Sequence, residues 1–466
     1  MRYVDAVPSA WAHRALAGSA PRPFWWDDAA RPEPCPRLDG PTTADLVVVG
    51  GGYLGLWAAL RATEREPGRD VLVVEGRRVA WAASGRNGGF CSASLTHGEA
   101  NGRSRFAEEM DVLHRLGREN LDAIEDTLVR HGIDAGFERT GELTVATEPH
   151  QVGGLAAAAT ARDVLLDRAQ VRARVATPMA LAGLWSPDTA LVHPTRLAWG
   201  LRRACLDRGV RIVERTPARD VGRDGAGVVV RTDGGDVRAR HAVLATNASP
   251  PLLRRVRAFV VPVHDHALMT RPLTSAELRS IGWAGREGLA DAGNQFHYAR
   301  LTDDDRVLWG GFDALYYPGG RIRPEHEHND ATYQRLAEHF RMTFPQLEDV
   351  TFTHRWGGLI DTCSRFMPFF GTAYAGRVAY SAGFTGLGVA STRFAADVVL
   401  DLLAGEETER TALRMVRSLP VPFPPEPLAT PAIGLTRWSI ARADRDGGRR
   451  NAWLRLLDAV GAGFDS

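Results

Sequence analysis

The stretch DLVVVGGGYLGLWAALRATEREPGRDVLVVEGRRVAWAASGRNGG, residues 45–89, decides the fold of this 466-residue chain. A β-branched apolar run over residues 46–49 leads into a glycine cluster. A helical run over residues 54–63 follows, and a second apolar run ends on Glu75. A strand, a tight glycine turn, a helix, a strand and a terminal acidic residue make up a βαβ dinucleotide-binding unit. The alternative is an ordinary βαβ crossover whose glycines serve only the turn.

The glycines and the acidic residue each have a role in such a unit. Gly50 lets the chain turn sharply out of the first strand, where a Cβ atom is strained. Gly52 lets the backbone approach a pyrophosphate, and Gly55 lets the helix pack closely against the strand. The helix N-terminus favours bound phosphate, and Glu75 is placed to accept hydrogen bonds from an adenosine ribose. The stretch predicts dinucleotide binding without distinguishing NAD from FAD.

Composition and charge indicate an ordinary globular protein. Hydrophobic residues make up 44% and charged residues 24% of the chain, and the net charge is +1. This balance argues against nucleic acid and an anionic membrane as partners, and no apolar run approaches the roughly 18 residues of a membrane span. The N-terminal residues lack the apolar region of a signal peptide. The four scattered cysteines form no CxxC pair, so we expect neither a metal site nor a disulfide framework. This cysteine usage is typical of a reduced compartment, so we expect a cytoplasmic enzyme.

All 57 basic residues are arginines, so the chain contains no lysine. A Schiff-base lysine, a lysine general base and a P-loop lysine are therefore impossible. Pyridoxal-phosphate chemistry on a lysine and P-loop phosphoryl transfer are excluded as functions.

The rest of the chain alternates between predicted helices and strands. Periodicity and end signals predict helices over residues 103–132, 150–174, 193–209, 330–344 and 389–404. Strands are predicted over residues 142–147, 210–214, 227–232, 236–240, 241–246, 260–271, 294–301, 306–312 and 378–381. The last of these strands runs into a further glycine-rich turn, GFTGLG at 383–388.

These elements predict an α/β fold with a discontinuous Rossmann-like domain and an α+β substrate domain built on an antiparallel sheet. Residues 1–100, 150–255 and 351–410 are assigned to the dinucleotide-binding domain, and residues 101–149 and 256–350 to the substrate domain. Residues 411–466 are predicted to form a Pro-rich linker and a helical tail, which wraps the body or contacts a second subunit.

Five segments together resemble the FAD-dependent D-amino-acid oxidase and glycine oxidase superfamily, and within it the γ-glutamylputrescine oxidase branch. They are VVVGGGYLGL with Glu75, ASGRNGG at 83–89, LATNA at 244–248, WGGLID at 356–361 and GFTGLG at 383–388. The resemblance covers nearly the whole chain in order. The ASGRNGG loop is specific, whereas GxGxxG is shared with many flavoproteins.

The resemblance implies FAD as cofactor, with pyrophosphate over the first glycine turn and ribose on Glu75. The implied cofactor-binding residues are Gly50, Gly52, Tyr53, Leu54, Gly55, Glu75, Gly76, Arg77, Ala83, Ser84, Arg86, Asn87, Gly88, Gly89, Val221, Thr246, Asn247, Gly357, Gly358, Gly383, Thr385, Gly386, Leu387, Gly388 and Val389. Some relatives tether the flavin to a cysteine. Cys363 does not match that position, so we expect noncovalent FAD. Some relatives use a lysine near the flavin to activate oxygen, and this chain has no lysine.

The implied reaction is hydride transfer from the carbon beside an amine to flavin N5, followed by hydrolysis of the imine. Candidate pocket residues are His297 and Tyr298, with Arg300 and His97 behind them, and His297, Tyr298 and Arg300 are the candidate catalytic residues. Arg300 or Arg86 is the candidate for binding a substrate carboxylate. A structural role for the histidines is the alternative.

The partners implied are a small-molecule amine or amino acid and oxygen or another electron acceptor. The competing functions are a flavin dehydrogenase, a monooxygenase, and a noncatalytic FAD-carrying subunit or binding protein.

Overall fold

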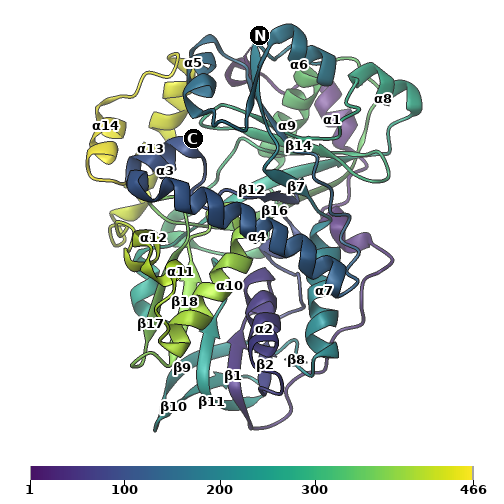
Figure 1. Cartoon of the computed structure of the whole chain (residues 1–466). Coiled ribbons are helices and arrows are strands. Elements are labelled where there is room, and N and C mark those ends of the chain that lie inside the picture. The colour runs from purple at the N-terminus through teal and green to yellow at the C-terminus, as the bar shows by residue number, and fades with distance from the viewer. Residues whose placement is uncertain (1, 464–466) are drawn as a thin grey trace.

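The computed structural model describes residues 2–463 and contains two large β-sheets with helices around them (Figure 1). The main path of the first sheet follows the order β17 (Phe369–Ala373), β18 (Val378–Ala382), β11 (Gly235–Leu244), β1 (Thr42–Val49), β2 (Val71–Val74) and β8 (Arg211–Val213). β10 (Gly227–Thr232) pairs antiparallel with β11, and β9 (Ala218–Asp224) pairs with β10. β1 lies parallel to both β11 and β2, with Leu46 opposite His241 and Val71. The segments of this sheet therefore come from distant parts of the chain.

The second sheet is mostly antiparallel. Its order is β16 (Phe352–Thr362), β12 (Val261–Thr270), β15 (Val307–Gly311), β14 (His297–Leu301), β13 (Gly288–Asp291), β4 (Glu142–Ala146), β6 (Ala182–Ser186) and β5 (Val164–Asp167). A separate pair joins β3 (Phe90–Ser92) to β7 (Thr189–Leu191). In Figure 1 the second sheet lies in the upper half of the molecule, and the first sheet lies in the lower half.

Helices cover both sheets. The α-helices are α1 (Ala10–Leu16), α2 (Tyr53–Arg65), α3 (Glu99–Phe106), α4 (Met110–Arg130), α5 (Pro149–Ala158), α6 (Arg168–Arg174), α7 (Pro194–Asp207), α8 (Ser275–Ile281), α9 (Asp330–Thr343), α10 (Gly388–Ala404), α11 (Glu409–Ala412), α12 (Arg414–Arg417), α13 (Ala429–Arg445) and α14 (Ala452–Ala459). Short 3-10 turns are Tyr3–Asp5, Phe24–Asp27, Ala83–Gly85, Ala107–Glu109, Arg254–Ala258, Pro318–Gly320 and Pro324–Glu327. Within residues 2–463 no helix combines the length and apolar character that a bilayer span requires.

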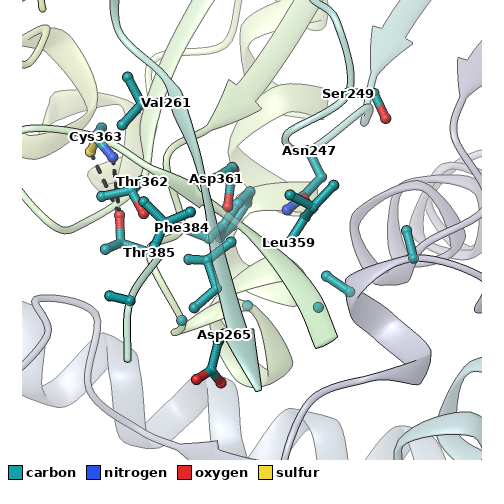
Figure 2. Close-up of a pocket in the computed structure, with 18 of the residues that line it drawn as sticks. Asn247, Ser249, Val261, Asp265, Leu359, Asp361, Thr362, Cys363, Phe384 and Thr385 are labelled. Atoms are coloured by element: carbon teal, nitrogen blue, oxygen red, sulfur yellow. Dashed lines mark hydrogen bonds between the residues drawn. The ribbon is translucent and has the colours of Figure 1, made fainter. Parts of the chain in front are cut away.

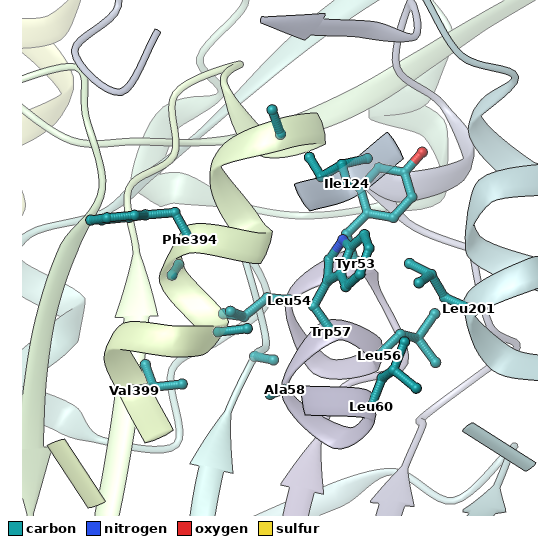
Figure 3. Close-up of a cluster of buried hydrophobic side chains, with 14 of the residues drawn as sticks. Tyr53, Leu54, Leu56, Trp57, Ala58, Leu60, Ile124, Leu201, Phe394 and Val399 are labelled. Atoms are coloured by element: carbon teal, nitrogen blue, oxygen red, sulfur yellow. The ribbon is translucent and has the colours of Figure 1, made fainter. Parts of the chain in front are cut away.

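The first helix of the βαβ unit is buried on almost every side. Leu56, Trp57 and Leu60 of α2 are completely buried. Figure 3 shows Leu56 and Leu60 beside Leu201 of α7, with Leu54 between α2 and α10. A helix that is apolar all round belongs in a core, because no face is left for water. α2 is thereby held rigidly between two other helices, with its N-terminus at the glycine turn.

Two predicted helices are interrupted in the structure. The expected helix over 103–132 is split into α3 and α4 by a 3-10 turn, because Phe106 leaves the helical region with φ −138° and ψ 41°. The expected helix over 150–174 is two helices with β5 between them. β5 pairs with β6, and Asp167 then caps α6 by accepting a hydrogen bond from the Gln170 N–H.

The sheets do not follow the predicted domain ranges throughout. β5, β6 and β16 belong to the second sheet, although residues 150–255 and 351–410 were assigned to the dinucleotide-binding domain. These strands are short or adjoin strands distant in sequence, so local pattern does not reveal their partners. The division into domains itself stays a prediction.

Candidate functional site

A cavity of about 1620 Å³ is lined by residues of both sheets and of the C-terminal segment. One part of its wall comes from the glycine turn after β1, the loop after β2 and the start of α10. Another part comes from β12, β14 and β16 of the second sheet. A cavity between two sheets with a few convergent polar groups is the usual form of a cofactor and substrate site.

The glycines of the turn after β1 allow close backbone contacts that a side chain would prevent. Gly50 has φ +115°, and a Cβ atom there would lie 2.4 Å from the Ala245 carbonyl oxygen. A Cβ atom on Gly55 would lie 1.9 Å from the Gly50 carbonyl oxygen, so the helix cannot approach the turn with any larger residue. The N–H of Tyr53, at the start of α2, donates to Ser84 Oγ over 2.9 Å. The hydroxyl of the second glycine-rich loop is thereby fixed at the helix N-terminus.

Glu75 follows the last residue of β2 and lines the cavity next to the glycine turn. Its carboxylate accepts hydrogen bonds from the N–H groups of Gly51 and Arg77, each over 2.7 Å. Burial raises the pKa of Glu75, and the two backbone N–H groups act against that shift. The carboxylate lines the cavity directly beside the glycine turn.

Arg86 ties the loop after β2 to the second sheet. Its guanidinium donates to Glu327 over 2.6 Å and to the Gly357 carbonyl oxygen over 2.7 Å. The same group lies against the rings of Trp26 and Trp81, at 4.8 and 5.4 Å from their centroids. Arg86 is therefore already paired, and its position supports the loop.

The turn before α10 is held from β16. Asp361 accepts a hydrogen bond from the Gly383 N–H over 2.7 Å, and burial raises the pKa of Asp361 to about 6. Figure 2 shows Asp361 with Phe384 and Thr385 on the cavity wall. Thr385 to Val389 line the cavity at the N-terminus of a helix of 17 residues. This end of α10 presents unpaired N–H groups and a partial positive charge.

Tyr298 and Asp265 form a polar pair on the part of the wall that belongs to the second sheet. The Tyr298 hydroxyl donates to Asp265 Oδ2 over 2.7 Å, and both residues line the cavity. Burial raises the pKa of Asp265 to about 6, while the hydrogen bond from Tyr298 acts in the opposite direction. Glycines make room for the ring, since a Cβ atom on Gly88 or Gly310 would lie 2.9 or 2.5 Å from it.

His297 faces away from the cavity. Its Nδ1 lies 2.6 Å from Asp291 Oδ2, and its Nε2 lies 2.8 Å from His339 Nδ1. The ring stacks between Trp309 and Phe312 in the core of the second sheet. Successive side chains of a strand point to opposite faces, so Tyr298 and His297 do not share a site.

Arg300 is also outside the cavity wall. Its guanidinium donates to the Val192 carbonyl oxygen over 2.6 Å, and burial lowers the pKa of Arg300 to about 10. We therefore do not retain His297 or Arg300 as substrate contacts. Their structural placement corrects the expectation from sequence, and Tyr298 alone of the three lines the cavity.

Comparison with known proteins identifies the family. The model of the DAO family, described as FAD dependent oxidoreductase, matches residues 45–402. This chain is a member of the DAO family. The γ-glutamylputrescine oxidoreductase of Escherichia coli is 30% identical over 84% of this chain and 90% of its own. The probable oxidoreductase OrdL of Haemophilus influenzae is 27% identical over 83% of this chain and 89% of its own.

Solved structures show the same fold. Glycine oxidase from Geobacillus kaustophilus superposes with a TM-score of 0.65 at 20% identity, over 79% of this chain and 96% of its own. L-proline dehydrogenase from P. horikoshii superposes with a TM-score of 0.64 at 19% identity, over 79% of this chain and 95% of its own. The family match makes this chain an FAD-dependent oxidoreductase, and the solved structures show that it shares their fold with its Rossmann-like domain.

The residues present fit FAD. Gly50 and Gly55 allow a close approach of turn and helix that a Cβ atom would prevent, and the Glu75 carboxylate lines the cavity beside this turn. Of the predicted cofactor residues, the following line the cavity: Gly50, Gly52, Tyr53, Leu54, Glu75, Gly76, Arg77, Ala83, Ser84, Arg86, Asn87, Gly88, Thr246, Asn247, Gly358, Thr385, Gly386, Leu387, Gly388 and Val389.

Five predicted residues lie behind the wall. Gly55, Gly89, Gly357 and Gly383 pack directly on other atoms, where a Cβ would come within 1.9 to 2.8 Å of a neighbour. Val221 is buried in the first sheet, and its carbonyl oxygen accepts a hydrogen bond from Tyr374. The cavity is lined instead by Ala218, Arg219 and Asp220 of the same strand.

Sequence reasoning missed Asp265 and Glu142. Asp265 stands between two histidines within an apolar strand, and an acidic residue in such a strand is a signal that it faces something polar. Glu142 also lines the cavity, and burial raises its pKa to about 7. The contribution of the C-terminal segment was missed as well, because nothing local shows where a tail docks.

Proposed function

We propose that this DAO-family enzyme oxidises the C–N bond of an amine or amino acid and passes the electrons to oxygen. The carrying observation is the Tyr298–Asp265 pair on the cavity wall, beside Gly88 and Gly358 of the residues that fit FAD. The names of the relatives support the substrate class, since they include a γ-glutamylputrescine oxidoreductase and a glycine oxidase.

The overall reaction balances without a metal or a lysine. FAD, when bound, accepts the hydride from the carbon beside the substrate nitrogen. The substrate is left as an imine, and water converts the imine to a carbonyl compound and an amine or ammonia. With oxygen as acceptor, one amine, one oxygen and one water give one carbonyl compound, one released amine or ammonia and one hydrogen peroxide.

Asp265 is the group that we assign to the substrate nitrogen. With a pKa of about 6, it is ionised at neutral pH and attracts a cationic or hydrogen-bonding amine. Tyr298 donates to one carboxylate oxygen and so fixes the orientation of the other. Tyr298 is therefore a positioning residue, and Asp265 the one that contacts the substrate.

The N-terminus of α10 supplies electrostatic support. Leu387, Gly388 and Val389 line the cavity at the positive end of this helix. A helix N-terminus stabilises negative charge that develops next to it. We assign this end of α10 to the side of the cavity where the flavin ring binds.

We expect FAD to be held without a covalent bond. Cys363 is the one cysteine on the described cavity wall. Its thiol donates to the carbonyl oxygens of Met367 and Gly383 over 3.2 and 3.4 Å, and burial raises its pKa. A thiol that stays protonated is a poor nucleophile. Denaturing the yellow protein should release all flavin into solution, and flavin that stays with the precipitated chain would contradict this expectation.

The identity of the electron acceptor is tested separately, because the chain contains no lysine to activate oxygen. The experiment is an aerobic assay across polyamines, γ-glutamyl-amines, N-methyl amino acids and D-amino acids. We expect one hydrogen peroxide for each carbonyl product. Carbonyl formation that depends on an artificial dye acceptor, without peroxide, would show a dehydrogenase instead.

The location and assembly of the protein remain predictions. We infer a cytoplasmic location, supported by four buried cysteines that are all unpaired. Self-association is also a proposal, and size-exclusion chromatography with light scattering of the holoenzyme tests it.

A further inference from the structure

The C-terminal segment contributes a wall of the cavity that lies beyond the part matched by the family model. The match ends at residue 402, whereas α13 and α14 follow it. One face of α13 lines the cavity with Ala432, Ile433, Thr436, Arg437 and Ile440. These residues recur at spacings of one, three and four, as expected for a single helical face. In Figure 1 the two helices lie at the side of the second sheet.

This segment is anchored to the second sheet by specific contacts. The Asp444 carboxylate accepts from the Asn294 side chain over 2.6 Å and from the Gln295 N–H over 3.2 Å. Asn294 and Gln295 precede β14, the strand that carries Tyr298, and both line the cavity. The Gly319 N–H donates to Thr430 Oγ1 over 3.1 Å. Helix α13 is thus held at both ends against the substrate side of the cavity.

Arg437 is the one charged side chain on the cavity-lining face of α13. Among the described residues it has no ion pair and no hydrogen bond. Burial lowers the pKa of Arg437, and the nearby Asp313 acts against that shift. Asp313 is itself paired with Arg335 and accepts a hydrogen bond from Thr332. A partly buried guanidinium without a partner gains most from an anion that enters the cavity.

Two other arginines on this part of the cavity wall are already paired. Arg86 is bound to Glu327, and Arg323 is 3.4 Å from Glu325. Arg300 is outside the cavity wall and donates to Val192. Arg77 and Arg254 also line the cavity without an ion pair among the described residues, but both are exposed to solvent. Arg437 is therefore the partly buried guanidinium on the described wall that has no partner.

We propose that Arg437 binds a carboxylate of the substrate, so that the C-terminal helix α13 selects amines that also carry a carboxylate. The inference rests on the proposed function, because it assigns one end of the same substrate. The planar guanidinium can meet a carboxylate with two parallel hydrogen bonds, which gives both affinity and orientation. Asp265 holds the nitrogen of the substrate, and Arg437 holds its acidic group.

The test compares substrates that differ only in the carboxylate. The probe pairs are sarcosine with sarcosinamide, D-alanine with D-alaninamide, and a γ-glutamyl-alkylamine with its α-amide. In Arg437→Gln holoenzyme we expect KM for the acids to rise about 10- to 100-fold, with little change for the amides. The matched control is Arg442→Gln on the same helix, since Arg442 is paired with Asp446 and does not line the cavity. Equal effects on acid and amide, or no effect on either, would overturn the proposal.

A binding measurement separates this proposal from the proposed function. Butanoate and butanamide cannot be oxidised as amines, and their binding is read from the change in the visible spectrum of bound FAD. We expect butanoate to bind more tightly than butanamide in the wild type and in Arg442→Gln, and this preference to vanish in Arg437→Gln. A wild type without the preference, or an Arg437→Gln variant that keeps it, would overturn the carboxylate site. Failure of every amine to reduce the flavin would instead reject the proposed function alone.

Discussion

At the scale of single residues, Asp265 carries the chemistry that we assign to this cavity. Asp265→Asn keeps the shape of the side chain and removes its charge. We expect kcat/KM for amines to fall about 10- to 100-fold above pH 7, because a hydrogen bond to an ionised group is lost. Because burial raises the pKa of Asp265 to about 6, wild-type kcat/KM should lose an additional factor of ten for each pH unit below 6.

The pH dependence of kcat/KM of Asp265→Asn is the control for this prediction. The additional loss below pH 6 should be absent in Asp265→Asn, whose amide does not titrate. The melting temperature of the variant at pH 8 should not fall, since burial disfavours the ionised carboxylate that the substitution removes. A pH profile that keeps the limb near 6 would assign it to another group.

Tyr298→Phe tests the positioning role separately. The ring remains in the space left by Gly88 and Gly310, and only the hydroxyl that donates to Asp265 is lost. That hydrogen bond lowers the pKa of Asp265, so its removal should move the acid limb of kcat/KM to higher pH. Measurement of kcat/KM between pH 5 and 9, a range of about four units around this pKa, decides the point. An unmoved limb would show that the hydroxyl does not act through Asp265.

Residue types alone could not separate the wall residues from their neighbours. His297, Tyr298 and Arg300 were predicted as one group, yet strand alternation places His297 on the opposite face. Arg300 is turned to a backbone carbonyl at Val192, which no local pattern reveals. The local places of Gly55 and Glu75 could be predicted, because their contacts lie within one βαβ unit.

At the scale of elements, the approach of α2 to the glycine turn is the critical contact. A Cβ atom on Gly55 would lie 1.9 Å from the Gly50 carbonyl oxygen, so Gly55→Ala forces the helix and turn apart. We expect the free energy of unfolding to fall by about 3 kcal/mol, together with loss of FAD binding. Thermal unfolding and flavin content of the purified chain are the measurements.

The matched control is Gly154→Ala on α5. No atom lies within 4 Å of a Cβ atom built on Gly154, and the residue is exposed on its helix. Alanine favours a helix interior over glycine by up to about 1 kcal/mol, so this variant should be as stable as the wild type or more so. Equal loss of stability in both variants would contradict the steric account of Gly55.

Helices and strands whose signals lie in neighbouring residues were predicted well. Elements that depend on pairing with a strand distant in sequence were not. The helices α2, α7, α9 and α10 and the strand β2 match their predicted ranges closely, whereas β1 begins four residues before its predicted start. The strand β5 was missed because, among the described strands, it pairs with β6 alone, and helix α6 separates the two strands in sequence. The break at Phe106 was missed because its buried neighbours keep helical spacing on both sides.

At the scale of the whole molecule, the cavity depends on segments that are far apart in sequence. The glycine turn, β12, β16, the start of α10 and the face of α13 all meet around one space. The discontinuous character of the first sheet followed from the return of strands after residue 210, whereas the docking of the tail had no signal in the sequence. The proposed site therefore needs both sheets and the C-terminal segment to be in place at the same time.

The most direct test of this account is anaerobic reduction of the bound flavin. The holoenzyme, free of oxygen, is mixed with each amine of the panel, and the visible absorbance of the oxidised flavin is followed. We expect at least one amine to bleach the flavin fully and rapidly, and the same amine to do so much more slowly with Asp265→Asn. A flavin that no amine bleaches would contradict the account, and bleaching at the same rate in both proteins would contradict the place of Asp265 in it.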